Sequence, residues 1–305
     1  MSGAGATTNR ATPFLSIAEY TTPGLTFAQD LEAYRTAGAD GIGIDAGLKL
    51  GGAERADPVH LALLRESGLK TAFLFPPVPS VLPMTVMALG EDAPAARIES
   101  MCRSVRGLAP FEPISFACAT GPQGRHELER AREIAVDGLR LVARAAADAG
   151  ASVAIEPMHT SIAADYSWIT NIPDAVELLD EIGEPNTGIM FDVWHLWDTP
   201  DLLAEIRAHA HRILGVHVDD WRDPTRNWCD RTLPGEGLAD LPGILGALDE
   251  GGYDGWYELE IFSDDGRFGN DYADSLWKLD PLELVRSGRE AFERAWRTRR
   301  LRNPS

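Results

Sequence analysis

The feature that most constrains this chain is a regular alternation of short β-rich runs and longer amphipathic runs, repeated eight times. The runs predicted as strands cover residues 14–20, 40–45, 69–75, 113–120, 151–157, 187–193, 213–220 and 255–262. The runs predicted as helices follow them at 26–38, 57–68, 93–108, 125–149, 171–183, 200–212, 238–252 and 280–300. Strands that alternate with helices pair in parallel. Eight such units predict an α/β protein with a closed (β/α)8 TIM barrel.

The competing α/β architecture is an open, doubly wound sheet. Such a sheet, when it binds dinucleotides, carries a G-x-G-x-x-G turn after its first strand, and the stretch "IAEYTTPGLTF" (17–27) has no such turn. The length of 305 residues suits one barrel of about 250 residues with insertions. We therefore expect a single TIM-barrel catalytic domain over residues 13–305, with long loops at its carboxyl-terminal face. Residues 1–12 are mostly small and polar, which predicts a disordered segment.

The charge balance excludes several kinds of partner. The chain has 28 basic and 47 acidic residues and a formal net charge of −19, so it repels phosphate backbones and anionic membrane surfaces. The chain has no run of about 18 apolar residues, so no membrane span is predicted. The first residues lack the basic and apolar regions of a signal peptide. We expect a cytoplasmic protein that binds neither nucleic acid nor membranes and acts on a small molecule.

Polar side chains gather where the last four predicted strands end. The chemistry of TIM barrels is located at that edge, where the carboxyl ends of all the strands meet. The fifth strand ends in "AIEPMHT", the sixth in "FDVWH", the seventh in "GVHVDDW" and the eighth in "YELEIF". These stretches contribute Glu156, His159, Asp192, His195, His217, Asp219, Asp220, Glu258 and Glu260.

Each of these residues has a structural explanation beside a functional one. A carboxylate at a strand end is often the N-cap of the next helix, and a lone histidine is more often a hydrogen-bonded packing residue than a ligand. Four consecutive strands that end in Glu, Asp, His and Glu are harder to explain in this way. Their carboxylates would repel one another at the barrel mouth unless a cation lay between them. The pattern therefore favours a divalent metal ion.

The residue types also indicate which ion to expect and which glutamate binds it. Three carboxylates and one imidazole form a hard, mostly oxygen site, which favours Mn²⁺, with Mg²⁺ or Co²⁺ as alternatives, over a sulfur-rich structural zinc site. Because side chains alternate along a strand, Glu258 and Glu260 share one face. Glu260 lies nearer the carboxyl end and is the expected ligand.

At this point the motifs match a known family. The stretches "AIEPMH", "FDVWH", "VHVDD", "RTLPGEG" and "GYDGWYELEIF" resemble the sugar phosphate isomerase/epimerase superfamily of xylose isomerase-like TIM barrels. The resemblance covers residues 14–300 and is strongest from 151 to 262. It implies one divalent metal ion bound by Glu156, Asp192, His217 and Glu260. It also implies that Glu156 and Glu260 move protons at the substrate carbon.

The resemblance implies further substrate contacts. His195, three residues after Asp192, looks like the residue that contacts a substrate oxygen, and Arg231 in "DRTLPGEG" looks like a residue that holds substrate oxygens or braces Glu260. His159 matches the histidine of "EPxH" and is also assigned to substrate binding. The three-metal cluster of endonuclease IV is not expected, because the third strand ends in "AFLFPPVPS" without a histidine and Thr232 stands where that enzyme has another.

Tryptophans and a long loop accompany the strand ends. Trp194, Trp197, Trp221 and Trp228 either stack on a sugar or glycoside ring or pack under the loops. Of these, Trp194 is our candidate for substrate binding. The Gly- and Asp-rich stretch 263–280 is long enough to form a lid or an oligomer contact, so a homo- or hetero-oligomer is left open.

The expected function follows from the implied ligands. We expect a metal-dependent isomerase or epimerase of a ketose, keto-inositol or related oxo-sugar, which abstracts a proton through a metal-stabilised enediolate. The same first step leads to elimination when a leaving group is present. The alternative is therefore a lyase, of the inosose dehydratase or 3-oxo-C-glycoside deglycosidase type. A non-catalytic sugar-binding or partner subunit is the third hypothesis.

Overall fold

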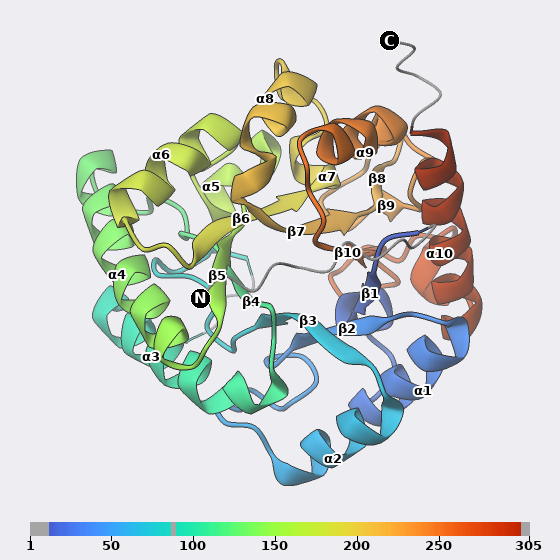
Figure 1. Cartoon of the computed structure of the whole chain (residues 1–305), viewed down its shortest axis with the longest axis horizontal. Helices are drawn as coiled ribbons and strands as arrows, with labels where there is room; N and C mark the ends of the chain where they lie inside the picture. The colour runs from blue at the N-terminus through green and yellow to red at the C-terminus, as the bar shows by residue number, and fades with distance from the viewer. Residues whose placement is uncertain (1–11, 87–89, 300–305) are drawn as a thin grey trace.

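The computed structural model describes residues 12–86 and 90–299, and within them the chain forms one closed barrel of parallel strands (Figure 1). The strand order around the barrel is β1-β10-β7-β6-β5-β4-β3-β2. The strands are β1 (Leu15–Ala18), β2 (Gly41–Asp45), β3 (Lys70–Phe75), β4 (Ser115–Cys118), β5 (Ser152–Ile155), β6 (Thr187–Asp192), β7 (Ile213–Val218) and β10 (Trp256–Leu259). The predicted TIM barrel is confirmed.

Helices surround the barrel and cover the outer side of every strand (Figure 1). The major helices are α1 (Phe27–Ala37), α2 (Pro58–Ser67), α3 (Pro94–Leu108), α4 (Leu128–Asp148), α6 (Ile172–Ile182), α8 (Leu202–His209), α9 (Leu241–Glu250) and α10 (Pro281–Thr298). The chain encodes their ends locally. Thr26 begins α1 with a capping box that includes Gln29, and Gly38 ends it in the left-handed conformation with φ 78°.

Two layers of apolar side chains make up most of the interior. The larger layer lies between the strands and the helices. The smaller one fills the inside of the barrel below the strand ends and includes Ala72, Phe73, Ala117, Ala154 and Met190. This inner layer fills the barrel, so polar groups at the carboxyl ends of the strands lie above packed apolar side chains.

Four short α-helices and β-strands were not predicted from the sequence. They are α5 (Ala163–Tyr166), α7 (Val193–Leu196) and the two-stranded antiparallel pair β8 (Asp220–Trp221) and β9 (Arg231–Thr232). All four lie in segments that follow a barrel strand, so they build the carboxyl-terminal face. The longest of these segments are 76–93, 156–171, 219–240 and 260–280. The prediction of long loops at this face is therefore confirmed.

The observed strands are shorter than the predicted ones. The stretch 14–20 forms a strand only over Leu15–Ala18, because the chain turns into a 3-10 helix from Glu19. Apart from Thr12, the segment predicted to be disordered, 1–12, lies outside the described residues. Among the described helices, none is both long and apolar enough to cross a membrane.

Candidate metal centre and active site

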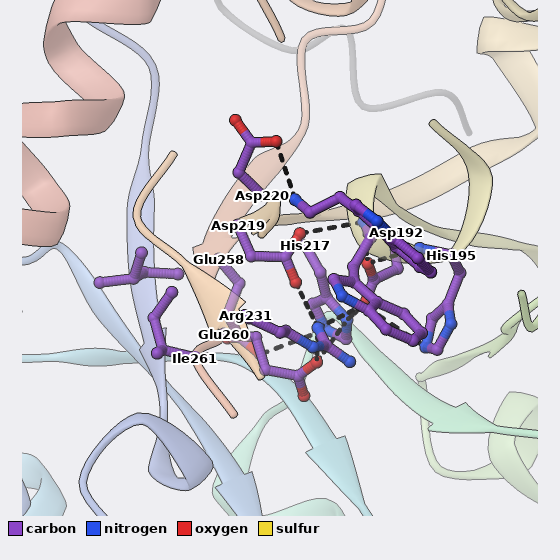
Figure 2. Close-up of polar contacts among 12 residues, drawn as sticks. Asp192, His195, His217, Asp219, Asp220, Arg231, Glu258, Glu260 and Ile261 are labelled. Carbon is purple, nitrogen blue, oxygen red and sulfur yellow. Dashed lines mark hydrogen bonds and ion pairs between the residues drawn. The ribbon is translucent and has the colours of Figure 1, made fainter. Parts of the chain in front are cut away.

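Four polar side chains from consecutive strands meet at the carboxyl-terminal face of the barrel. Glu156 follows β5, Asp192 ends β6, His217 lies in β7 and Glu260 follows β10. Each offers one ligand atom, and these four atoms lie within 4.8 Å of one another. All four side chains are buried, and Asp192, His217 and Glu260 are labelled in Figure 2. The structure therefore brings together the four residues that the sequence predicts as ligands.

The two oxygens of Asp192 have different partners. Oδ1 accepts hydrogen bonds from the backbone N–H groups of Trp194 at 2.6 Å and His195 at 3.2 Å, which caps the short helix α7. Oδ2 faces the cluster and lies 3.6 Å from Nδ1 of His217. Asp192 thus caps a helix with one oxygen and is a candidate metal ligand through the other, so the structural and the functional explanation of this residue are compatible.

Arg231 is the cation nearest to the cluster. It lies in β9, whose pairing with β8 aligns Arg231 with Trp221. Its Nη1 lies 2.9 Å from Asp192 Oδ2 and 3.0 Å from Glu260 Oε2, and it also contacts the carboxylate of Asp219 (Figure 2). Arg231 is only 3% exposed, so these contacts form in a region of low dielectric. This geometry matches the predicted bracing of Glu260.

The cluster contains three carboxyl groups and one imidazole, and their pKa values shift in different directions. Burial raises the pKa of Glu156 and brings that of Glu260 to about 7. Burial also opposes ionisation of Asp192, but Arg231 and the nearby histidines outweigh it and hold the pKa of Asp192 well below its usual range. Burial disfavours the charged form of His217 too, yet Glu260 and Glu156 raise its pKa well above the usual value. Such opposite shifts among neighbouring groups are typical of functional sites.

His195 is held as a neutral hydrogen-bond donor. Burial lowers its pKa to about 3. Its Nδ1 accepts a hydrogen bond from the backbone N–H of His159 at 3.1 Å, so the ring proton must be on Nε2. His195 lines the cavity beside the cluster, and its Nε2 lies 3.7 Å from Asp192 Oδ2. This nitrogen is therefore available to donate to an oxygen bound next to Asp192.

His159 and Trp194 lie behind His195 and do not line the cavity. The side chain of His159 is hydrogen-bonded to Ser161 at 2.7 Å and packs at a tilt against Trp221, with 4.5 Å between ring centroids. Trp194 is 1% exposed and stacks on Trp221 with ring centroids 4.6 Å apart. Direct substrate contact by these two residues stays a prediction, and the geometry favours a supporting role.

The cavity above the cluster has a polar side and an apolar side. It contains about 720 Å³ of empty space, including the part open to solvent, which is typical of sites for small molecules. Glu156, Glu260, His195 and Arg231 lie on the polar side. The rest of the lining is mainly apolar and includes Phe75, Pro79, Met84, Met158, Ile162, Tyr166, Trp228 and Phe262. Of the four candidate stacking tryptophans, Trp228 lines this cavity.

The sequence analysis missed two polar residues of the lining, Tyr20 and Asp45. Tyr20 follows β1 and Asp45 ends β2, and both side chains line the cavity. Burial raises the pKa of Asp45 to about 6. The signal that found the other residues, a polar side chain at a strand end, was also present in "SIAEY" and "GIGID".

The family is shown by a sequence profile. The profile described as xylose isomerase-like TIM barrel matches residues 31–294, which is most of the chain. This chain belongs to that family. The resemblance drawn from the strand-end motifs is thereby confirmed.

Characterised relatives of this family member include three kinds of enzyme. The inosose isomerase of Bacillus velezensis is 24% identical over 147 residues, which cover 45% of this chain and 49% of the relative. The inosose dehydratase of Geobacillus thermodenitrificans is 25% identical over 147 residues, which cover 43% of this chain and 47% of the relative. L-ribulose-5-phosphate 3-epimerase of Escherichia coli is 29% identical over 131 residues, covering 42% of each chain. The chain thus matches about half the length of these relatives.

Solved structures of similar shape cover nearly the whole chain. Protein SMc04130 of Sinorhizobium meliloti superposes with a TM-score of 0.79 at 26% identity, covering 92% of this chain and 98% of its own. The IOLI protein with a bound zinc atom superposes with a TM-score of 0.74 at 20% identity, covering 93% of this chain and 98% of its own. These structures share the barrel fold over nearly all of this family member.

Proposed function

We propose that this protein is a divalent-metal-dependent isomerase or epimerase of a ketose, keto-inositol or related oxo-sugar, which works by proton transfer through an enediolate. The observation that carries the proposal is the pair Glu156 and Glu260. Both belong to the acidic cluster, both line the cavity, and burial raises the pKa of both. Carboxyl groups with raised pKa values suit general acid–base catalysis near neutral pH. The inosose isomerase and the epimerase among the relatives support the substrate class.

The donor set of the cluster fits a divalent ion. Glu156, Asp192 and Glu260 offer oxygen and His217 offers nitrogen, all from buried positions. These ligands suit Mn²⁺, with Mg²⁺ or Co²⁺ as alternatives, and the zinc atom of the IOLI protein supports a divalent ion of this size. When bound, the ion would supply the positive charge that stabilises the oxygens of an enediolate.

The chain's own residues account for the remaining chemistry. Either Glu156 or Glu260 removes the proton from the substrate carbon, and the other glutamate or a water returns it to the opposite face or to the next carbon. His195 donates its Nε2 proton to a substrate oxygen, because its Nδ1 is already bonded to the His159 backbone. Arg231 holds Glu260 and Asp192 in place through its contacts with both carboxylates.

Hydrogen exchange with deuterated solvent tests this proposal. The Mn²⁺-loaded protein is incubated in D₂O with a panel of ketohexoses and inososes, and deuterium incorporation is followed by NMR. We expect incorporation at one carbon next to the carbonyl, with a loss of about 100-fold or more in Glu156→Gln and Glu260→Gln. The matched control is Glu283→Gln, which removes a carboxylate from the first turn of α10, away from the cavity. Sugar binding without any exchange would instead support a non-catalytic sugar-binding or partner subunit.

A lyase is the second candidate, and the apolar side of the cavity favours it. Free sugars and inositols carry hydroxyl groups on almost every carbon, and Met84, Met158 and Ile162 offer those groups no hydrogen-bond partner. Tyr166 is 8% exposed, and its hydroxyl has no hydrogen-bond partner among the described residues. This side would suit an apolar leaving group, as in a 3-oxo-glycoside. The inosose dehydratase among the relatives supports elimination as a chemistry.

A pair of substrates distinguishes the two candidates. Phenyl and methyl 3-oxo-glucosides are offered to the loaded protein, and the released phenol or methanol is measured together with deuterium exchange. Release of phenol supports the lyase, whereas exchange without release supports the isomerase or epimerase. Tyr166→Phe is expected to slow phenol release several-fold and to leave exchange of an unsubstituted ketose unchanged.

A further inference from the structure

Glu258 is a fully buried carboxylate directly beneath the candidate metal centre. It lies in β10, two residues before Glu260, and is 0% exposed. It does not belong to the cluster of four potential ligands. Its Oε1 lies 3.5 Å from Nε2 of His217, on the opposite edge of the ring from Nδ1, which faces the other carboxylates (Figure 2). The imidazole of His217 therefore separates Glu258 from the cluster.

The two facing atoms have no other hydrogen-bond partner. Among the described residues, neither Nε2 of His217 nor Oε1 of Glu258 makes a hydrogen bond, although both are buried. Burying polar atoms without partners is costly. A separation of 3.5 Å is too short to admit a water molecule and only slightly longer than a hydrogen bond. Each atom is thus the natural partner of the other.

Two neighbouring strands hold Glu258 in this position. Ser16 in β1 pairs with Glu258 in register and donates a hydrogen bond from Oγ to Oε2 at 2.7 Å. Gly43 in β2 leaves the space that the carboxylate occupies, because a Cβ atom at this position would lie 2.2 Å from Oε1 and 2.3 Å from Oε2. Residues from three strands therefore form a slot for one carboxylate whose free oxygen faces His217.

Nδ1 of His217 is hydrogen-bonded to Oε1 of Glu156 at 3.0 Å, and aromatic side chains pack around the rest of the ring. Phe73 and Phe75 lie beside it, with ring centroids 6.1 Å and 6.0 Å away. Such contacts limit tilting of the ring, but they do not distinguish one nitrogen from the other. A carboxylate at Nε2 does so, because it accepts the N–H there and leaves the Nδ1 lone pair toward the cluster.

We propose that Glu258 is a positioning residue, which fixes the orientation and tautomer of His217 so that Nδ1 is presented to the metal ion. This inference rests on the proposed function, since it assumes that the cluster binds a divalent ion. It explains why the barrel interior contains a buried carboxylate that an apolar side chain of similar size could replace without loss of packing.

Metal titration of the whole chain tests the proposal. Isothermal titration with Zn²⁺ compares the wild type with Glu258→Met, Glu258→Gln and Gly43→Ala, each first checked for folding by circular dichroism. We expect Glu258→Met and Gly43→Ala to weaken Zn²⁺ binding by about 10- to 100-fold. Glu258→Gln keeps an acceptor oxygen and is expected to retain affinity within about five-fold, on the basis of the same hydrogen bond. The matched control is Glu19→Gln, which alters another buried carboxylate that does not contact His217.

A spectroscopic readout separates positioning from a merely structural role. In the ¹⁵N-histidine-labelled, Zn²⁺-loaded wild type, His217 is expected to show a protonated Nε2 that exchanges slowly with solvent, and Glu258→Met is expected to lose this protection. If Glu258→Met binds Zn²⁺ as tightly as the wild type and keeps the signal, the positioning role is wrong and the metal site stands. If the wild type itself binds no ion, the proposed function fails and this inference fails with it.

Discussion

The backbone N–H of His159 donates a hydrogen bond to Nδ1 of His195 at 3.1 Å. Backbone N–H groups cannot exchange roles, so this contact determines which nitrogen of His195 carries the proton. The sequence motif placed both histidines near the strand ends, but it assigned both to the substrate. In the structure one of them orients the other through its backbone, and only His195 lines the cavity.

His195 is predicted to stay neutral over a wide pH range. Burial lowers its pKa to about 3 in the folded, metal-free protein, against about 6.5 in the unfolded chain. Its contribution to stability is therefore fully present above pH 6.5 and is lost as the pH falls toward 3. An NMR titration of ¹⁵N-labelled histidines in EDTA checks this, with His195→Gln to assign the signal. A midpoint between pH 5.5 and 7.5 for His195 would contradict the assignment.

Metal binding is predicted to release protons. Without an ion, burial brings the pKa of Glu260 to about 7, and the surrounding carboxylates raise the pKa of His217 against the effect of burial. Both residues must lose their protons to bind a cation. We expect more than one proton to be released per Mn²⁺ at about pH 6, measured by calorimetry in buffers with different ionisation enthalpies. Heats that do not depend on the buffer would show that these groups do not bind the ion.

The same raised pKa predicts how stability depends on pH. A carboxyl group whose folded pKa is raised to about 7 stabilises the fold below its unfolded pKa, and this contribution is lost as the pH rises through 7. The metal-free protein should therefore lose stability between about pH 4.5 and 7, through Glu260 and the similarly shifted Glu156. The increase in melting temperature on adding Mn²⁺ should grow over the same range. An equal increase at pH 5 and pH 8 is not compatible with this account.

Arg231 is predicted to stabilise the metal-free site. Arg231→Met leaves Asp192, Asp219 and Glu260 without their shared cation, which should cost about 3–5 kcal/mol in the free energy of unfolding. Saturating Mn²⁺ should recover part of that loss, because it supplies positive charge to the same carboxylates. Urea denaturation with EDTA or with Mn²⁺ measures both effects. Arg294→Met, which breaks an exposed ion pair with Glu236, is the control and should cost at most about 1 kcal/mol.

Lys49 is predicted to stabilise the barrel away from the metal centre. Its Nζ lies 3.0 Å from Oδ2 of Asp30, and the two side chains are 4% and 0% exposed. Lys49→Met should destabilise the protein by about 3–5 kcal/mol, because it leaves a buried carboxylate without its counter-ion. Arg103→Met, which breaks a solvent-screened pair with Glu54, should have a much smaller effect on stability. Similar urea midpoints for the two variants would show that burial of the Lys49 pair does not matter.

The sequence predicted the parts of this site that depend on strand periodicity. Asp192, His217 and Glu260 could be placed because each comes at a strand end. The two-residue period put Glu258 and Glu260 on one face, and Glu260 was chosen because it lies nearer the carboxyl end. The slot around Glu258 could not be predicted, because it forms where β1, β10 and β2 meet on closure of the barrel. Closure joins residues 241–242 positions apart, such as Ser16 with Tyr257 and Glu258.

The apolar side of the cavity could not be predicted from the sequence for a different reason. Met84, Met158 and Tyr166 lie in the long segments that follow β3 and β5, and the paths of these segments depend on tertiary contacts rather than on a local pattern. The orientation of the Trp194 side chain, which was predicted to contact the substrate, also depends on tertiary contacts. A side chain that follows a strand can turn toward the cavity or away from it, and α7 turns Trp194 away, against Trp221.

The most direct test of the account is the metal content of the purified protein. The protein is reloaded with Mn²⁺, passed through a desalting column and analysed for metal by mass spectrometry, beside Glu156→Gln and Asp192→Asn. The account predicts about one ion per chain in the wild type and a loss of most of it in both variants. If the folded wild type retains no divalent ion after reloading, the four residues do not form a metal centre and the proposed proton-transfer chemistry is wrong.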